Sequence, residues 1–195
     1  MKRIIAFLIA AVMMFSLSAC SSQETTPDNT ADPIVKTELA MGYTTEPEGL
    51  DPHRTAAAST FTVTNNIYDT LIGVASDWSI TPRLAKEWII SEDGMNITFT
   101  LRDDVYFHNG RQMTAKDVEF SFNRLKDAES PKARDYANIV KIEVLDDYNI
   151  KFTTETLDVE FLKSFAYPWA AVVPEEAVET LKTNPVGTGA FTLKE

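Results

Sequence analysis

The sequence predicts a mixed α/β protein in which short antiparallel hairpins alternate with helices. Two pairs of strand-like runs flank the turn signals Asp93-Gly94 and Asp146-Asp147, and three of these four runs alternate apolar with polar residues. Between these pairs, an amphipathic helical pattern begins at Thr114. Because strand and helix patterns follow one another in an irregular order, the predicted fold class is mixed α/β.

The N-terminus has the charged, apolar and small residues of an export signal, in the order typical of one. Lys2 and Arg3 precede an apolar run over 4–15, and small residues then lead to Cys20, the only cysteine. The run of 12 residues is well below the roughly 20 that a membrane-spanning helix needs. Residues 17–20 (Leu-Ser-Ala-Cys) resemble the lipobox of bacterial lipoproteins, which implies a signal peptide over 1–19 and lipidation of Cys20. A cleaved secretory peptide with an incidental cysteine and an uncleaved anchor are the alternatives.

The composition of the remaining chain limits its function. Cleavage before Cys20 leaves 176 of the 195 residues and changes the formal net charge from −11 to −13, because Lys2 and Arg3 are removed. Such an acidic chain does not suit nucleic acid, which needs clustered Lys and Arg. A single cysteine excludes an internal disulfide. No cofactor is expected, since the sequence has no phosphate-binding, zinc-protease or serine-hydrolase motif.

The first elements are a tether, a strand and a helix. Residues 20–33 lack large apolar side chains and are rich in Ser, Thr, Asp and Pro, which predicts a flexible tether. Residues 34–43 are predicted to form a strand. After a loop with prolines and glycine, Ser59 is predicted to cap a helix that runs to about Ile72. The expected buried residues of this helix are Phe61, Ile67, Tyr68, Leu71 and Ile72.

The central region predicts a hairpin, a further turn and a helix. Strands at Trp88–Ile90 and Ile97–Leu101 pair through the Asp93-Gly94 turn. A strand at Val105–His108 leads into a turn at Asn109-Gly110. The helix from Thr114 is predicted to start with a capping box to Asp117 and to bury Val118, Phe122 and Leu125.

The last third predicts another hairpin and several short elements. Val140, Ile142 and Val144 alternate with polar residues, and Tyr148, Ile150 and Phe152 do so on the return. Short helices are predicted over Val159–Ala166 and from Pro174, in the first turn, to about Lys182. The glycine-bearing loop Pro185–Gly189 leads to a strand at Phe191–Leu193. This strand has no end signal, which predicts that the chain is a fragment of something longer.

Several motifs in a fixed order resemble the family 5 extracellular solute-binding proteins, the oligopeptide, dipeptide and nickel receptors of ABC importers. The resemblance covers nearly all of residues 36–195. The motifs that carry it are Leu50–His53, Tyr68–Leu71, Ser91–Gly94, Phe99–Arg102, Phe107–Gly110, Thr114–Val118, Val140–Val144 and Pro185–Gly189.

The resemblance implies a periplasmic-binding-protein-like, two-lobed receptor (type II, with an extra domain), of which the chain holds the N-terminal lobe and the added domain only. Residues 34–55 would start lobe I, residues 56–183 would form the added subdomain, and residues 184–195 would return to lobe I as a truncated strand. The protein would capture extracellular peptides for the ABC permease subunits in the membrane, without catalysis. It is expected to be an extracytoplasmic monomer that is lipid-anchored to the cell membrane, or at the periplasmic or outer-membrane face.

The resemblance also supplies the candidate binding residues. In such receptors the segment after L-D-P-x lines the cleft and offers backbone groups to an extended peptide. This assigns ligand binding to Thr55, Ala56, Ala57, Ala58 and Ser59, with an ordinary loop leading into a helix as the alternative.

The histidines and glycines are open to more than one interpretation. No metal site is expected, because nothing in the sequence brings His53 and His108 together. His108 is expected to bond to its own turn, whereas the loop position of His53 leaves proximity to ligand open. Gly187 and Gly189 are interpreted either as a hinge or as an ordinary turn before a strand.

Other functions remain open at this point. Within the same family, the ligand could be a nickel chelate, haem or another small solute. A secreted hydrolase on an unrelated α/β fold is an alternative of a different class. A truncated product that binds nothing is a third possibility.

Overall fold

The computed structural model describes residues 37–38, 40–156 and 161–194, and all helices and strands named below belong to one compact unit, Tyr43–Glu195. The predicted signal peptide, the predicted lipidation site Cys20 and the predicted tether lie outside the described residues. Within the described part of the chain, no helix is both long and apolar enough to cross a membrane.

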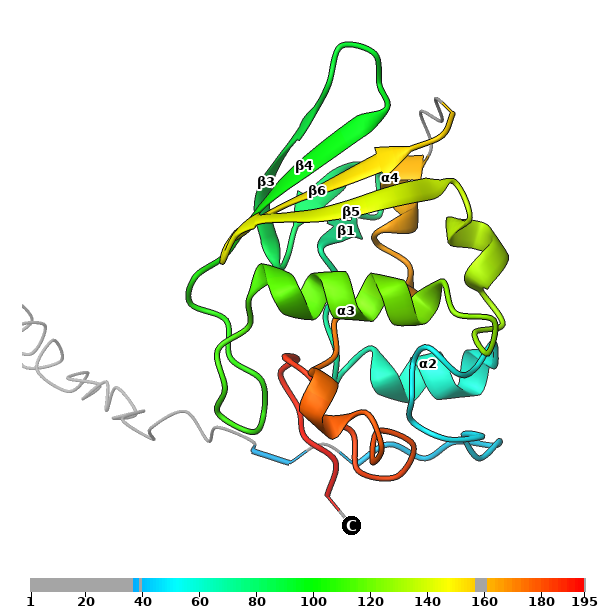
Figure 1. Cartoon of the computed structure of the whole chain (residues 1–195). Coiled ribbons are helices and arrows are strands. Elements are labelled where there is room, and N and C mark those ends of the chain that lie inside the picture. Colours follow the sequence, from blue (N-terminus) through cyan, green and yellow to red (C-terminus); the bar gives the residue numbers. More distant parts are fainter. Residues whose placement is uncertain (1–36, 39, 157–160, 195) are drawn as a thin grey trace, which may run out of the picture. The chain divides into compact units, whose positions relative to one another are not determined.

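A four-stranded antiparallel sheet of order β3-β4-β6-β5 forms the larger sheet of this unit (Figure 1). The hairpin of β3 (Ala85–Ile90) and β4 (Asn96–Leu101) is confirmed, and the turn contains Gly94 at a φ of 71°. The hairpin of β5 (Ile139–Asp146) and β6 (Asn149–Thr154) is confirmed as well. β4 and β6 pair along the middle and join the two hairpins into one sheet.

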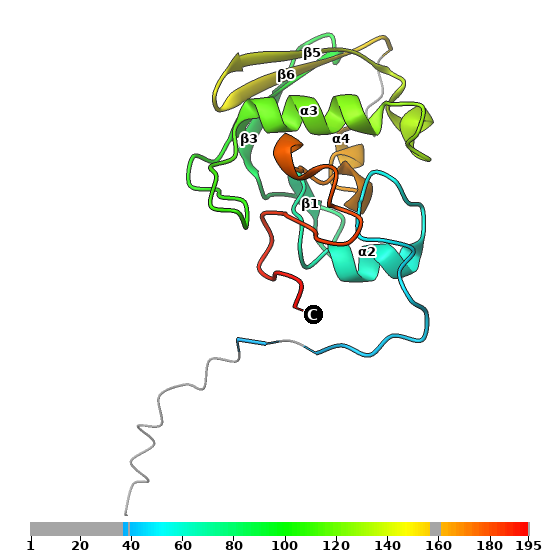
Figure 2. The ribbon, with the colours of Figure 1, turned by 60° about the horizontal axis from the view of Figure 1, so that its bottom comes forward.

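One face of the sheet is covered by α3 (Ala115–Leu125), which runs beneath β5 and β6 (Figure 2). The predicted start of this helix is confirmed, because Thr114 is the N-cap and its N–H donates to the Asp117 carboxylate at 2.8 Å. The predicted buried residues Val118, Phe122 and Leu125 are all buried. Capping fixes where the helix begins, and the apolar stripe fixes which side meets the sheet.

Aromatic rings fill the space between α3 and the sheet. The Phe122 ring lies 4.9 Å from Phe152 on β6 and 5.1 Å from Phe165, between ring centroids. Phe165 follows the short helix α4 (Phe161–Ser164), and its ring also contacts Phe99 on β4 at 5.0 Å. Tilted and edge-on contacts of this kind add to the free energy gained from burying the rings.

The helix predicted to reach Ile72 is much shorter. α2 spans Ala58–Thr64, so Ser59 lies inside the helix and Ala57 is the N-cap. Four of its seven residues are β-branched, which lowers helix propensity. The chain then turns into a small hairpin of β1 (Ile72–Val74) and β2 (Ile80–Pro82), which the sequence did not predict. The five residues predicted to be buried here are buried nonetheless.

Three further predictions are wrong for the described residues. The described part of 34–43 and residues 191–193 are not strands, because no described strand runs beside them to complete a ladder. Val105–His108 is reduced to a single bridge between Tyr106 and Gln112, although its Asn109-Gly110 turn is present.

Short 3₁₀ turns take the place of one predicted helix. Pro174 is extended and precedes η3 (Glu175–Ala177), after which turn hydrogen bonds such as Thr180 N–H to the Ala177 carbonyl replace α-helical ones. The other 3₁₀ turns are η1 (Ala133–Tyr136) and η2 (Pro168–Ala170). Of the predicted helix at 159–166, the described part contains α4, and residues 159–160 lie outside the described residues.

A register shift in β5 decides which of its apolar residues are buried. The alternating pattern places Val140 with Ile142 and Val144, but the ladder shifts between Ile139 and Lys141. Ile139 is therefore 1% exposed and Val140 is 56% exposed. A bulge of this kind places one extra residue in a strand and so moves side chains between faces.

The shift predicts unequal effects at two neighbouring residues. Ile139→Val should lower the free energy of unfolding by about 1 kcal/mol, because it removes a fully buried methyl group. Val140→Ala should change it by less than about 0.5 kcal/mol, as for other exposed positions. Urea unfolding of the two variants measures both values, and a larger loss at Val140 would contradict the shifted register.

Candidate functional site

The five predicted ligand-binding residues span the loop before α2 and its first two residues. Thr55 is buried, and its hydroxyl accepts a hydrogen bond from the Ala57 N–H at 3.0 Å. Ala56 and Ala58 are exposed, and the Ala57 carbonyl accepts from the N–H groups of the third and fourth residues of the helix. The segment therefore presents backbone and methyl groups at the surface of this unit.

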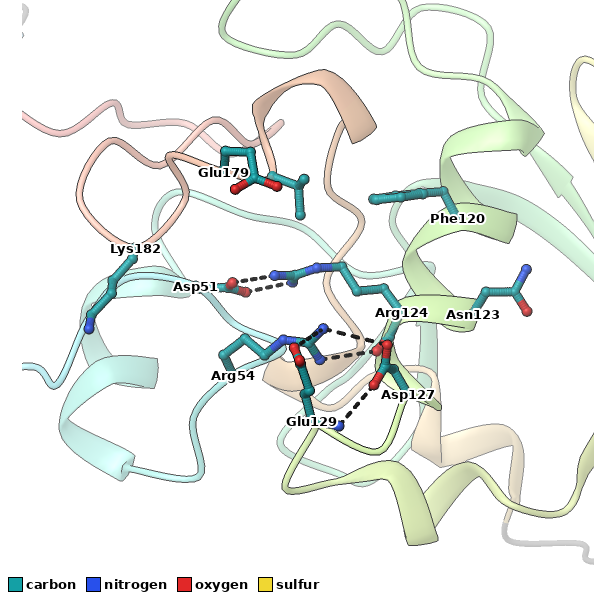
Figure 3. Close-up of a pocket in the computed structure, with 10 residues that line it drawn as sticks. Asp51, Arg54, Phe120, Asn123, Arg124, Asp127, Glu129, Glu179 and Lys182 are labelled. Atoms are coloured by element: carbon teal, nitrogen blue, oxygen red, sulfur yellow. Dashed lines mark hydrogen bonds and ion pairs between the residues drawn. The ribbon is translucent and has the colours of Figure 1, made fainter.

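Just before this segment, Asp51 forms a buried ion pair with Arg124 of α3, which no motif in the sequence predicts. Both Asp51 carboxylate oxygens accept from the Arg124 guanidinium, at 2.8 and 2.5 Å, and Asp51 is 7% exposed (Figure 3). The His53 N–H also donates to Asp51, at 3.0 Å. Burial alone would raise the pKa of Asp51, but the hydrogen bonds and charge of Arg124 outweigh it and hold this pKa below its ordinary value.

Arg54 completes the contact with the end of α3. Its Nη1 donates to the carbonyl oxygen of Arg124 at 3.3 Å. Its Nη2 pairs with Glu129 at 3.3 Å and, at 3.9 Å, with Asp127. Figure 3 shows the Arg54 guanidinium beside these two carboxylates, whereas the Arg124 guanidinium faces Asp51. The sequence around residue 51 therefore contacts both the side chain and the backbone of Arg124.

These charged residues line an open hollow of about 620 Å³ (Figure 3). The lining residues come from the segment before α2, from the C-terminal half of α3 and the turn after it, and from the turns after η3. They are Asp51, Arg54, Phe120, Asn123, Arg124, Asp127, Glu129, Val178, Glu179 and Lys182. The lining mixes both signs of charge, so the hollow has no single electrostatic preference.

His53 lies in the interior of the unit and not beside an open surface. It is 1% exposed, and its Nε2 lies 2.9 Å from the Ala171 carbonyl oxygen, to which it donates. Its Nδ1 is buried and has no hydrogen-bond partner among the described residues. Burial is the main cause that lowers the pKa of His53 to about 4, and the ring is neutral at pH 7.

Burial of a neutral histidine predicts a loss of stability in acid. The unfolded chain takes up this proton near pH 6.5 and the folded chain only near pH 4, so the folded state loses stability as the pH falls between these values. The expected loss is about 3 kcal/mol. Urea unfolding from pH 7 to pH 4 measures it. His53→Gln keeps a donor for Ala171 but does not titrate, so an equally steep pH dependence in this variant would contradict the assignment.

His108 bonds to a distant loop, which corrects the prediction that it bonds to its own turn. Its Nε2 donates to the Gly189 carbonyl oxygen at 2.9 Å, and its Nδ1 accepts from the Gly187 N–H at 3.3 Å. Its own N–H donates to the Gly187 carbonyl oxygen at 2.9 Å. Three hydrogen bonds therefore fasten the loop 185–189 to the turn after Tyr106.

The two glycines of that loop allow a close approach of backbones. A Cβ on Gly187 would lie 2.1 Å from the Ile67 carbonyl oxygen, and one on Gly189 would lie 2.7 Å from the Asn66 carbonyl oxygen. Neither glycine has a positive φ.

The two histidines bond to different carbonyls, and no cluster of three His, Cys, Asp or Glu suited to a metal occurs among the described residues.

Comparison with known proteins identifies what the chain resembles. The model of bacterial extracellular solute-binding proteins, family 5 Middle, matches residues 79–195. Di/tripeptide-binding protein 2 of Pseudomonas aeruginosa (strain UCBPP-PA14) is 31% identical over 183 residues, which cover 78% of this chain and 34% of that protein. The chain thus spans about a third of the length of this relative.

Solved structures agree with the sequence comparison. The periplasmic binding protein DppA from Helicobacter pylori, in complex with peptide STSA, matches with a TM-score of 0.67 and 31% identity over 75% of this chain and 34% of that one. NikZ from Campylobacter jejuni, in complex with Ni(L-His), has a TM-score of 0.67 and 27% identity over 77% of this chain and 32% of that one. Both the predicted fold class and the predicted resemblance are confirmed.

Proposed function

The chain belongs to the bacterial extracellular solute-binding proteins of family 5, and from that premise we propose that it is part of a peptide receptor of an ABC importer. The observation that carries the proposal is the similarity, over three quarters of this chain, to a binding protein in complex with a peptide. The receptor would bind peptide outside the cytoplasm and deliver it to the permease without converting it.

In this proposal, Thr55, Ala56, Ala57, Ala58 and Ser59 contribute backbone groups to the peptide site. The small exposed side chains at Ala56 and Ala58 support it, because they let an extended main chain come close without selecting its side chains. Residues 34–55 and 184–195 would belong to lobe I, and residues 56–183 to a subdomain packed on that lobe. Ligand would favour the closed arrangement of the two lobes of the complete receptor.

We further propose that the receptor is held at the membrane through a lipid on Cys20. The charged start, the apolar run and the small residues before this cysteine support the proposal. The test is the intact mass of protein extracted from membranes, compared with a Cys20→Ser variant. A mass without a lipid increment, or unchanged membrane retention of the variant, would contradict it.

Calorimetric titration tests the proposed function directly. The complete protein that contains this sequence is freed of ligand and titrated with Met-Leu and with Ser-Thr-Ser-Ala. The expected result is saturable binding of at least one peptide, which is then recovered with its mass unchanged. Hydrolysis of the peptides would indicate an enzyme, and the absence of binding would contradict a peptide receptor.

A nickel chelate is the second candidate ligand, because the structure of a protein in complex with Ni(L-His) matches this chain with the same TM-score as the peptide complex. The same titration with nickel and L-histidine, alone and together, distinguishes the two ligand classes. Binding of the chelate in preference to both peptides would replace the peptide by a metal complex as the cargo.

A further inference from the structure

We propose that Arg124 is a positioning residue for ligand binding: its paired hydrogen bonds to Asp51 hold the segment Thr55–Ser59 in place from the end of α3. This inference rests on the proposed function, because it assumes that this segment contacts the ligand. Arg124 itself does not need to touch the ligand.

The base of the segment is fixed by several parts of the unit. Asp51 is held by Arg124, and the Arg54 guanidinium in turn bonds the Arg124 carbonyl. On other sides, the His53 ring bonds Ala171, and the Leu50 N–H donates to the Lys182 carbonyl at 3.0 Å. Residues 50–54 therefore have a defined position relative to α3 and to the segments around 171 and 182.

The segment itself has only local hydrogen bonds. Among the described residues, Thr55 and Ala57 bond to each other, and the Ala57 carbonyl bonds to the start of α2. Its position therefore depends on what holds its two ends. Small displacements of a binding segment lower affinity, because part of the binding free energy is then used to restore its position.

Arg124 suits this role through its geometry and its surroundings. It lies two residues after Phe122, whose ring is packed among the aromatic rings of the core, so its backbone is fixed to the sheet. A planar guanidinium can hold both oxygens of a carboxylate at once, whereas a lysine ammonium holds them as a point charge. The position of α3 is thereby transmitted to Asp51 and to the segment that follows it.

A matched pair of substitutions separates positioning from stability. Arg111 makes the same kind of two-pronged contact at the other end of α3, to Asp117 at 3.0 and 2.5 Å. In the complete protein, Arg124→Lys should weaken binding of the better-bound peptide of Met-Leu and Ser-Thr-Ser-Ala by about tenfold. Arg111→Lys should leave it within about twofold of the unchanged protein. Both are measured where circular dichroism shows each variant to be folded.

Hydrogen exchange gives a second readout that does not need ligand. The backbone amides of residues 55–59 should exchange faster in Arg124→Lys and at an unchanged rate in Arg111→Lys. If Arg124→Lys does not fold, Asp51→Asn takes its place, since it keeps the shape of the side chain and one acceptor oxygen.

Each outcome decides the inference. Unchanged affinity and exchange in Arg124→Lys, or equal losses in both variants, would overturn it. If the unchanged protein binds neither peptide, the proposed function fails, and the exchange rates alone still show whether Arg124 holds the segment. Faster exchange without any peptide binding would retain the structural role and reject its use for peptides.

Discussion

Phe122→Ala should lower the free energy of unfolding by about 4 kcal/mol. The Phe122 ring is 1% exposed and contacts the rings of Phe152, Phe165 and Tyr136, at 4.9, 5.1 and 5.8 Å between centroids. These partners belong to β6, to the segment after α4 and to η1, so truncation would leave a cavity where three segments meet. Fully buried aromatic residues show the largest losses of this kind, because their neighbours cannot collapse into the space.

Phe120 provides the matched control on the same helix. It is only partly buried and lines the open hollow, so Phe120→Ala should cost about 1 kcal/mol. Urea unfolding of both variants gives the two values. Equal losses at the two positions would show that the aromatic cluster is not the main core of this unit.

Gly187→Ala should lower the free energy of unfolding by more than about 3 kcal/mol. The new Cβ would lie 2.1 Å from the Ile67 carbonyl oxygen, a separation that no side-chain rotation can relieve. The loop would have to move away from Ile67 and would then lose its hydrogen bonds to His108. Urea unfolding measures the change.

Gly42→Ala is the control, because a Cβ there would meet nothing within 4 Å. It should leave the free energy of unfolding unchanged within about 0.5 kcal/mol.

The same comparison distinguishes the two interpretations of Gly187, a hinge and a close backbone contact. A hinge would tolerate alanine in the folded state and lose ligand-driven closure, whereas close backbone contact predicts a loss of stability before ligand is added.

Local patterns were sufficient for part of the fold. The hairpins at Asp93-Gly94 and Asp146-Asp147 and the start of α3 at Thr114 depend on residues within a few positions of one another, and all three are confirmed. Turn chemistry and capping are encoded locally, so a single sequence displays them. The family resemblance, carried by several such motifs in order, is confirmed as well.

The remaining features depend on contacts between distant residues. Asp51 and Arg124 are 73 positions apart, and no periodic pattern relates them. The same holds for His108, whose partners lie in the loop 185–189, and for the register shift at Ile139, which is set by pairing with β6. The end of α2 was misplaced because buried residues continue past Thr64 while the backbone no longer forms a helix.

Photo-crosslinking tests most directly whether Thr55–Ser59 contacts a bound peptide, as we propose. A Met-Leu analogue with a diazirine in the leucine side chain is bound to the complete protein, irradiated and mapped by mass spectrometry, with excess Met-Leu as competitor. We expect a crosslink within residues 55–59 that excess Met-Leu suppresses. If every crosslink that excess Met-Leu suppresses falls outside this segment, the proposed contact is contradicted.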